Sequence, residues 1–467
     1  MRALLRAKLA LAAVLGAAGT ASAQDRHEWS LGYGELGALI GGAATGSVRD
    51  PSAGYYNPGA LSFVKDAGVS VFDTVMGYQR FALDGVAGTN RNLVASDIEW
   101  TPVMLAGLFH PREGSKQTVA WSVLTRARAD LRVDGRAEAI VDVVAGLPGP
   151  ERYTATYEAR SLVHEAWIGV GPSMVVIERG DNRLAVGFTQ FITFRSGLAS
   201  TVVDAAAFNP FSGGNAVSRD RRRAEYLLVG LAWKLGVAAD LAPFRLGLTL
   251  TPPSVHLFGQ GEMSWQQASA GVDLTGDSFP DPYDQSLADD HAEARWHRPA
   301  AVAFGGSFEW DPWRVHLGVE WTAAQGAYAV LRTDQALASP PMGGVAYDFR
   351  HSQHAVLNAG VGVERVFAEK LRGVAGLWTD FSTGPEATDS AVTLAQWDLF
   401  HVGAGVAWTL EGATLWLGLI TTFGTGELDQ PANFSQASEA TRLFGGPSTG
   451  DVFYLGLRLT VAYRFTF

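Results

Sequence analysis

The chain of 467 residues has no cysteine, few charged residues and, beyond its first two dozen positions, no long apolar run. Without cysteine it can form no disulfide and carry out no thiol chemistry. Charged residues make up 18% of the chain, whereas about 25% is usual in globular domains. No segment after the amino terminus approaches the ~18 uninterrupted apolar residues that a membrane helix needs. A disulfide scaffold and a helical membrane protein are therefore excluded.

The first residues have the three parts of a secretory signal peptide. Arg2, Arg6 and Lys8 supply positive charge, residues 9–18 form an apolar core, and residues 21–23 (Ala-Ser-Ala) form a cleavage site. We expect residues 1–23 to be removed, so that the mature chain begins at Gln24. An exported chain without a membrane helix is periplasmic, secreted or an outer-membrane barrel. The formal net charge of −11 argues against nucleic acid as a partner.

The last sixteen residues, 452–467, alternate between apolar side chains and small or polar ones, which is the period of a β-strand. The apolar set runs from Phe453 to Phe467, and the other set includes Arg458 and Arg464. Such a strand covers roughly 40 Å along a barrel axis, enough to cross a bilayer. We interpret it as a strand with lipid outside and a polar lumen inside. Its terminal phenylalanine resembles the end of bacterial outer-membrane barrels, which the barrel-assembly machinery would bind.

Thirteen further segments read as strands, and the connections alternate between long and short, with both chain ends on the short side. Outer-membrane barrels have this asymmetry, whereas a large soluble β-sandwich, the alternative, does not predict it. We predict an all-β fold, a transmembrane antiparallel β-barrel of 14 strands over residues 67–467, with a short N-terminal hatch over residues 24–66 that plugs the lumen. The predicted strands are residues 67–79, 98–110, 117–133, 153–177, 183–198, 223–237, 243–264, 296–310, 313–333, 352–367, 370–382, 397–410, 413–425 and 452–467.

Residues 50–61, Asp-Pro-Ser-Ala-Gly-Tyr-Tyr-Asn-Pro-Gly-Ala-Leu, resemble the hatch of the FadL-type transporters of long-chain fatty acids and other hydrophobic compounds. That family shows an aromatic residue followed by Asn-Pro-Ala-Gly-Leu, and here the small pair is inverted. Residues 251–262, which begin Thr-Pro-Pro-Ser, are a second similarity late in the seventh strand. The hinge or latch of the hatch would consist of Tyr56, Asn57, Pro58 and Gly59. A plain turn is the alternative for these residues.

The resemblance implies uptake of hydrophobic molecules, with long-chain fatty acids as the default ligand, by a monomer in the cell outer membrane. Outer-membrane lipid and lipopolysaccharide would surround the barrel. Substrate would be captured by outer loops, pass to a site in the lumen and leave sideways through a gap in the wall after the hatch rearranges. A pocket that buries an alkyl chain gains ~0.8 kcal/mol per methylene.

Four arginines on the predicted lumen face are candidates to bind a ligand carboxylate, because arginine offers a two-pronged donor. The alternative is that they pair with Asp130, Glu165 and Glu320 across the lumen. Residues 219–223 (Arg-Asp-Arg-Arg-Arg), expected in a loop at the outer rim, could bind lipid phosphates or form a solvated loop. The four candidates are Arg126, Arg128, Arg195 and Arg458.

Nothing in the sequence indicates catalysis, a cofactor or a metal site. Residues 32–37 match the dinucleotide pattern G-x-G-x-x-G, but no βαβ unit surrounds them. The acidic residues of 273–293 lack calcium-loop spacing. Two competing functions stay open: a structural or surface-interaction barrel without selective transport, and a membrane lipid hydrolase built on Ser161 and His164.

Overall fold

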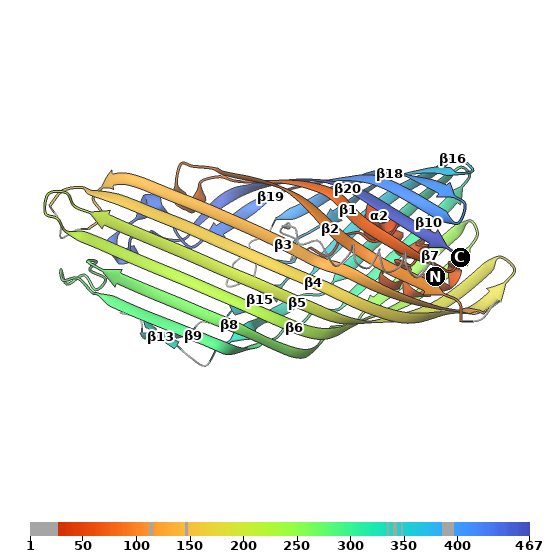
Figure 1. The fold of residues 1–467 in the computed structure, drawn as a ribbon, viewed down its shortest axis with the longest axis horizontal. Coiled ribbons are helices and arrows are strands. Elements are labelled where there is room, and N and C mark those ends of the chain that lie inside the picture. Colours follow the sequence, from red (N-terminus) through yellow and green to blue (C-terminus); the bar gives the residue numbers. More distant parts are fainter. Residues whose placement is uncertain are drawn as a thin grey trace, which may run out of the picture.

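The computed structural model describes residues 27–111, 115–144, 148–333, 336–339, 343–346, 349–384 and 397–467. One antiparallel sheet forms a closed barrel, because β1 (Gly68–Leu83) pairs with both β2 (Leu93–Phe109) and the last strand, β20 (Ser448–Thr466) (Figure 1). The predicted all-β barrel fold is thereby confirmed. The expected signal peptide, residues 1–23, lies outside the described residues.

The wall crosses from end to end fourteen times, as predicted. Ten crossings are continuous strands and four are each split into two pieces. Besides β1, β2 and β20, the continuous strands are β3 (Gln117–Val141), β4 (Glu151–Arg179), β5 (Asn182–Phe208), β6 (Asn215–Leu241), β17 (Leu371–Asp380), β18 (Asp398–Leu410) and β19 (Ala413–Gln430). The split crossings are β7 (Phe244–Thr251) with β8 (Val255–Ala270), β9 (Tyr283–Ala294) with β10 (Ala301–Trp310), β11 (Trp313–Thr322) with β12 (Gln325–Arg332), and β15 (Phe349–Gln353) with β16 (Val356–Ala368). A separate hairpin consists of β13 (Ala336–Ser339) and β14 (Gly343–Ala346).

The interruptions correct the prediction of unbroken strands from the seventh to the tenth. Pro252 and Pro253 end β7, since proline has no N–H for the ladder. The next three crossings break at residues 295–300, 323–324 and 354–355. In addition, β9 occupies part of the segment expected to be a long loop.

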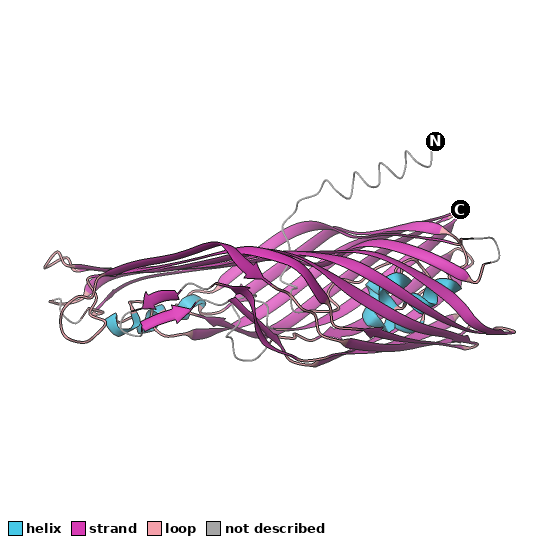
Figure 2. Ribbon diagram, turned by 90° about the horizontal axis from the view of Figure 1, so that it is seen from below, coloured by secondary structure: helices cyan, strands magenta, loops and turns pink. Residues whose placement is uncertain are grey.

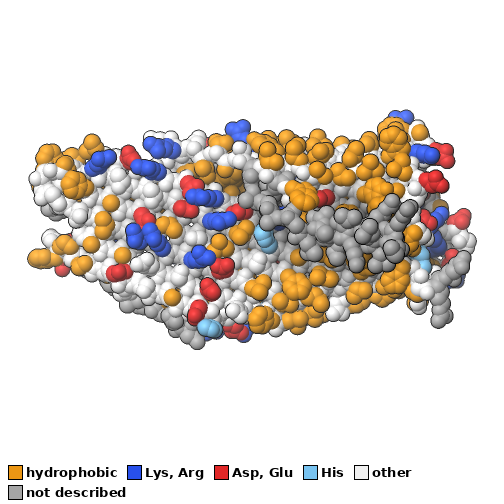
Figure 3. Space-filling view, viewed as in Figure 1, with side chains coloured by type: hydrophobic (Ala, Val, Ile, Leu, Met, Phe, Trp, Pro, Cys, Tyr) orange, Lys and Arg blue, Asp and Glu red, His pale blue; other side chains and the backbone are white. Residues whose placement is uncertain are grey.

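Side chains alternate between the two faces of the wall, as the period of two requires. In β20 the set from Phe453 to Phe465 points outward, while Arg458 is buried inside. Figure 3 shows apolar side chains over the end of the barrel that carries the carboxyl terminus, and charged ones more often beyond them. In the described part of the chain, no helix is long and apolar enough to span a membrane.

Strands β3 to β6 have 25, 29, 27 and 27 residues. Strands β3, β5 and β6 are far longer than predicted, whereas β4 exceeds its predicted range, residues 153–177, by only two residues at each end. All four strands extend toward the end of the barrel opposite the carboxyl terminus (Figure 1). There the outer face carries cross-strand ion pairs, such as Arg160 with Asp130 at 2.8 Å and Arg219 with Asp204 at 2.7 Å. Residues 219–223 lie within β6, which corrects their expected place in a loop.

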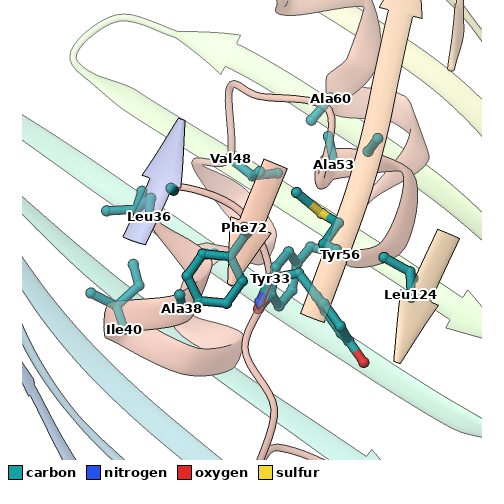
Figure 4. Close-up of a cluster of buried hydrophobic side chains, with 14 of the residues drawn as sticks. Tyr33, Leu36, Ala38, Ile40, Val48, Ala53, Tyr56, Ala60, Phe72 and Leu124 are labelled. Carbon is teal, nitrogen blue, oxygen red and sulfur yellow. Dashed lines mark hydrogen bonds between the residues drawn. The ribbon is translucent and has the colours of Figure 1, made fainter. Parts of the chain in front are cut away.

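The described residues before β1 lie inside the barrel, at the end that carries the carboxyl terminus (Figure 2). We call residues 27–66 the hatch. It contains α2 (Gly37–Ile40), η1 (Gly41–Gly46), α3 (Ala53–Tyr56) and η2 (Pro58–Phe63). Its side chains form one buried cluster with residues of the wall, among them Phe72 and Leu124 (Figure 4).

The far end of the lumen holds a second buried cluster. It combines wall residues such as Tyr153 and Trp397 with the short helices η3 (Val86–Gly88) and η4 (Phe434–Gln436); η5 (Glu439–Thr441) follows η4. Each end of the described barrel is thus filled by a different part of the chain.

Candidate functional site

Asn57 ties the hatch together and to the wall. Its Oδ1 accepts a hydrogen bond from the backbone N–H of Gly59 at 3.1 Å. Its Nδ2 donates to the carbonyl oxygens of Thr45 at 3.2 Å and of Val237, in β6, at 3.0 Å. Pro58 then opens η2, where its fixed φ suits the first helical position. A fully buried amide with three partners makes this turn a junction between hatch and barrel.

The residues beside Asn57 dock on other strands. Thr249 of β7 donates its hydroxyl to the carbonyl of Tyr56 at 2.8 Å. Ser173 of β4 donates to the carbonyl of Gly59 at 3.0 Å and accepts from the hydroxyl of Ser62 at 2.7 Å. The four hinge or latch candidates from the sequence therefore lie where the hatch contacts β4, β6 and β7. Their role in gating is taken up below.

Tyr33 connects the hatch to an irregularity in β3. Its backbone N–H donates to the hydroxyl of Tyr56 at 2.9 Å, and its own hydroxyl donates to the carbonyl of Thr125 at 3.0 Å. A register shift between Thr125 and Ala127 marks a β-bulge there. Burial raises the pKa of Tyr33 to about 12, so the hydroxyl keeps its proton. The hatch thus holds the bulge by a neutral hydrogen bond.

Glycines line the inner wall where the hatch backbone comes closest. A Cβ added to Gly403 would lie 2.4 Å from the carbonyl oxygen of Leu39, and one added to Gly187 would lie 2.3 Å from the carbonyl carbon of Pro58. Such separations are too short for any side chain. Glycine at these positions therefore lets the hatch contact the wall backbone to backbone.

A buried charge cluster surrounds the start of the hatch. Glu28 pairs with Arg126 of β3, and its Oε1 lies 2.8 Å from Nη1 of Arg298, in the interruption between β9 and β10. Glu165 of β4 binds Arg298 through both oxygens, at 3.1 and 2.8 Å, and also pairs with Arg195 at 2.8 Å. Although burial opposes ionisation, Arg126 and Arg298 hold the pKa of Glu28 below its ordinary value. Glu28 is therefore an anion in the closed hatch.

Arg128 does not share the face of Arg126. The bulge shifts the register by one residue, so that Ala127 pairs with the inward residue Glu165 and Arg128 pairs with His164 on the outer face. Nη1 of Arg128 donates to the carbonyl of Trp100 in β2 at 3.3 Å. The expectation that Arg128 faces the lumen is therefore wrong, and a one-residue bulge is the reason.

The residues that follow Glu28 bind three other parts of the wall. Trp29 donates through Nε1 to Glu320 at 2.9 Å. The hydroxyl of Ser30 donates to Asp380 of β17 at 2.6 Å, and Arg458 of β20 donates to the carbonyl of Ser30 at 2.7 Å. Arg458 thus faces the lumen as predicted, and its partner there is hatch backbone.

Sequence reasoning missed Glu28, Arg298 and Asp380. Arg298 follows a segment read as a loop, and Glu28 is separated by 98 and 270 residues from the arginines it binds. The only available signal was that an acidic residue stands in a segment predicted to enter a lumen with several arginines.

The wall has a seam between β2 and β3. The two strands pair only from Met104 to Phe109 and from Val119 to Leu124, although both continue past these pairs toward the far end. The hydroxyl of Thr125 donates to the carbonyl of Pro102 at 2.7 Å where the seam begins. A cavity of about 430 Å³ lies beside it, lined by residues of β3 to β6. The backbone ladder is thus interrupted next to the bulge that Tyr33 contacts.

The remaining candidates from the sequence do not form a reaction centre. Ser161 and His164 leave β4 on opposite faces, because they are three positions apart on a strand whose side chains alternate. They cannot form the pair that the hydrolase hypothesis needs. Among the described residues, no group of three or more histidine, aspartate or glutamate side chains could hold a metal ion.

The comparisons with known proteins place the fold. No family model matches the sequence, and no curated protein does. Among solved structures, a FadL homologue of Pseudomonas aeruginosa matches with a TM-score of 0.58 and 13% identity over 93% of this chain and 100% of that one. The toluene transporter TodX of Pseudomonas putida gives a TM-score of 0.57 with 13% identity over 93% of this chain and 99% of that one. The toluene transporter TbuX of Ralstonia pickettii gives 0.53 with 12% identity over 93% and 98%. The chain therefore has the fold of the FadL-type transporters.

Proposed function

We propose that the protein is an outer-membrane channel for the uptake of hydrophobic molecules, with long-chain fatty acids as its ligands. The observation that carries the proposal is the hatch, a segment that fills one end of the lumen and is fastened to the inner wall by hydrogen bonds in addition to its covalent connection to β1. The shared fold with FadL-type and toluene transporters supports the same reading. So does the outer apolar belt (Figure 3), which suits lipid and lipopolysaccharide as surroundings.

The seam between β2 and β3 supports sideways release. An apolar ligand that leaves through the wall reaches the hydrocarbon of the bilayer without crossing water. Tyr33 links the hatch to the bulge at this seam, so movement of the hatch changes a contact at the proposed exit. Asn57 and its neighbours then act as the latch that fastens the hatch when no ligand is present.

A reversible lock on the hatch tests the proposal. The hydroxyl oxygens of Ser62 and Ser173 lie 2.7 Å apart, so cysteines at both positions are placed to form a disulfide, and the chain has no other cysteine. In cells that lack their own fatty-acid channel, the double variant should take up labelled palmitate only after reduction. Ser62→Cys alone should transport under both conditions.

The competing function, a structural or surface-interaction barrel, predicts a different result. A barrel whose hatch merely seals the lumen would show no palmitate uptake in any variant, oxidised or reduced. Equal uptake by locked and reduced protein would instead show that the hatch does not gate the route.

A further inference from the structure

The charges around the start of the hatch are unequal in number. Three arginines, Arg126, Arg195 and Arg298, share two carboxylates, Glu28 and Glu165, in one connected group of ion pairs. Arg126 and Arg195 are at most 3% exposed. Because buried cations are costly without counter-charges, removal of any one carboxylate leaves a strong preference for another anion.

The two carboxylates that bind arginine differ in what holds them. Glu165 belongs to β4 and is saturated, with Arg298 on both oxygens, Arg195 on one and the Trp167 indole at 2.6 Å on the other. Glu28 belongs to the hatch, and its carboxylate bridges Arg126 and Arg298. Glu28 is thus the counter-ion that can leave without dismantling the wall.

The two arginines that pair with Glu28 both lie at irregularities of the wall. Arg126 occupies the β3 bulge, and Arg298 occupies the break between β9 and β10. The Nε of Arg126 is buried without a hydrogen-bond partner among the described residues. Aromatic rings flank the pair, with Trp167 5.5 Å from Arg298 and Tyr55 6.0 Å from Arg126. The surroundings therefore suit a carboxylate that carries an apolar tail.

The cavities that adjoin Glu28 and Arg298 in the closed structure are small. The cavity lined by Glu28, Tyr55 and Lys234 measures about 20 Å³, and the one lined by Glu165, Arg195 and Arg298 measures the same. Each holds about one water. A ligand carboxylate that pairs with both Arg126 and Arg298 therefore has to take the place of Glu28.

We propose that Glu28 occupies the place of the ligand's own carboxylate, so that an incoming carboxylate displaces it from Arg126 and Arg298 and frees the start of the hatch. The inference rests on the proposed uptake function and narrows its substrate class to amphiphiles with a carboxylate. A neutral hydrocarbon or alcohol cannot compensate the two arginines and leaves Glu28 in place. Head-group charge then decides which molecules open the hatch.

The test compares palmitate with 1-hexadecanol, which has the same chain length and no charge. The purified protein in a non-ionic detergent carries Ser52→Cys as a reporter, because Ser52 is a hatch residue that is 1% exposed. Palmitate should raise the rate of maleimide labelling and hexadecanol should not. Glu28→Gln should bind palmitate about tenfold more tightly, with binding of hexadecanol unchanged. Glu28→Asp should restore the lower affinity.

The control variant is Ser30→Ala, which removes a hydrogen bond from the same hatch segment but leaves the arginines paired. It should loosen the hatch without altering the preference for palmitate. The inference is overturned if Glu28→Gln binds palmitate no more tightly than the unaltered protein does, or if it binds both lipids more tightly by the same factor. It is also overturned if hexadecanol accelerates maleimide labelling of Ser52→Cys as much as palmitate does. Uptake of hexadecanol or toluene without palmitate would overturn the inference and the choice of fatty acids as ligands, while the uptake of hydrophobic molecules stands. Uptake of none of the three would refute both the inference and the proposed function.

Discussion

At the scale of single residues, the hatch depends on buried polar side chains with several partners each. Asn57 joins Gly59, Thr45 and Val237. A buried group that loses its partner costs about 1–3 kcal/mol. The Asn57 amide therefore stabilises the hatch in its seated position and contributes little to the stability of the barrel as a whole.

We expect Asn57→Ala to release the hatch more often and leave the barrel folded. Labelling of Ser52→Cys by a maleimide should accelerate by about tenfold or more, since three hydrogen bonds are lost. Asn209→Ala is the matched control, because Asn209 is equally buried and its Nδ2 binds the carbonyls of Pro148 and Gly149 outside the hatch. Equal acceleration in both variants would contradict the special role of Asn57.

Glu35 makes the seating of the hatch dependent on pH. Burial raises its pKa from 4.5 to about 7, against the opposing effect of Arg464 and of the Trp416 indole, while Asp50 adds to the rise. The seated hatch therefore holds the proton more tightly than the unfolded chain does. This stabilisation is complete below pH 4.5 and is lost as the pH rises through about 7.

Labelling of Ser52→Cys should accordingly be faster at pH 8 than at pH 5. Glu35→Gln removes the titrating group and keeps the shape of the side chain. At each pH, the labelling rate of the protein with Glu35 is divided by the rate of the Glu35→Gln variant. This ratio cancels the pH dependence of the thiol itself, which is the same in both proteins. A ratio that stays constant from pH 5 to pH 8 would show that Glu35 does not control the hatch.

At the scale of elements, the hatch fits because its helices contact strands at glycines. Gly403 of β18 lies against the carbonyl oxygen of Leu39, which a Cβ would approach to 2.4 Å. We expect Gly403→Ala to destabilise the seated hatch by about 1–3 kcal/mol relative to the released hatch. Because the hatch then leaves the lumen more often, ion conductance across a planar bilayer should increase. Gly326→Ala is the control, since a Cβ at Gly326 meets nothing within 4 Å. Identical conductance in the two variants would refute the close-contact argument.

The sequence predicts elements well where one rule decides them. Alternation of side chains predicts the carboxy-terminal strand correctly, because one face of that strand is directed to lipid and the other to the lumen. Proline in a ladder is an equally local rule, and Pro252 and Pro253 could have indicated the break after β7. The breaks at residues 323–324 and 354–355 involve no proline and depend on neighbouring strands.

Features that need two distant segments were not predictable. The outer face of β3 to β6 beyond the apolar belt is polar and ion-paired, so its alternation is weak, and β3, β5 and β6 were predicted too short. The direction of Arg128 depends on a bulge that no residue type marks. Glu28 meets its arginines only through the fold, so the charge cluster follows from packing and not from any motif.

At the scale of the whole molecule, the barrel is longer than the membrane it is proposed to cross. The 29 residues of β4 span about 95 Å along the strand, whereas an outer-membrane barrel needs an apolar band of only about 25 Å. The outward residues of β4 change from Ile168, Val170 and Met174 to Thr156, Glu158 and Arg160 along the strand. The bilayer therefore belongs at the hatch end, and the longest strands project beyond it.

Two arginine substitutions on one face of one strand test this placement. Val170→Arg puts a charge in the apolar belt, where it should cost about 2–4 kcal/mol, while Thr156→Arg lies in the projecting part and should cost about 0–1 kcal/mol. Urea unfolding in lipid vesicles measures both differences. In a non-ionic detergent the two costs should move closer together, because detergent adapts to a charge more readily than a bilayer does. If Thr156→Arg proved as costly as Val170→Arg in vesicles, the bilayer would cover the projecting strands as well, and the cross-strand ion pairs of β3 to β6 would lie in lipid, where their charges are least favourable.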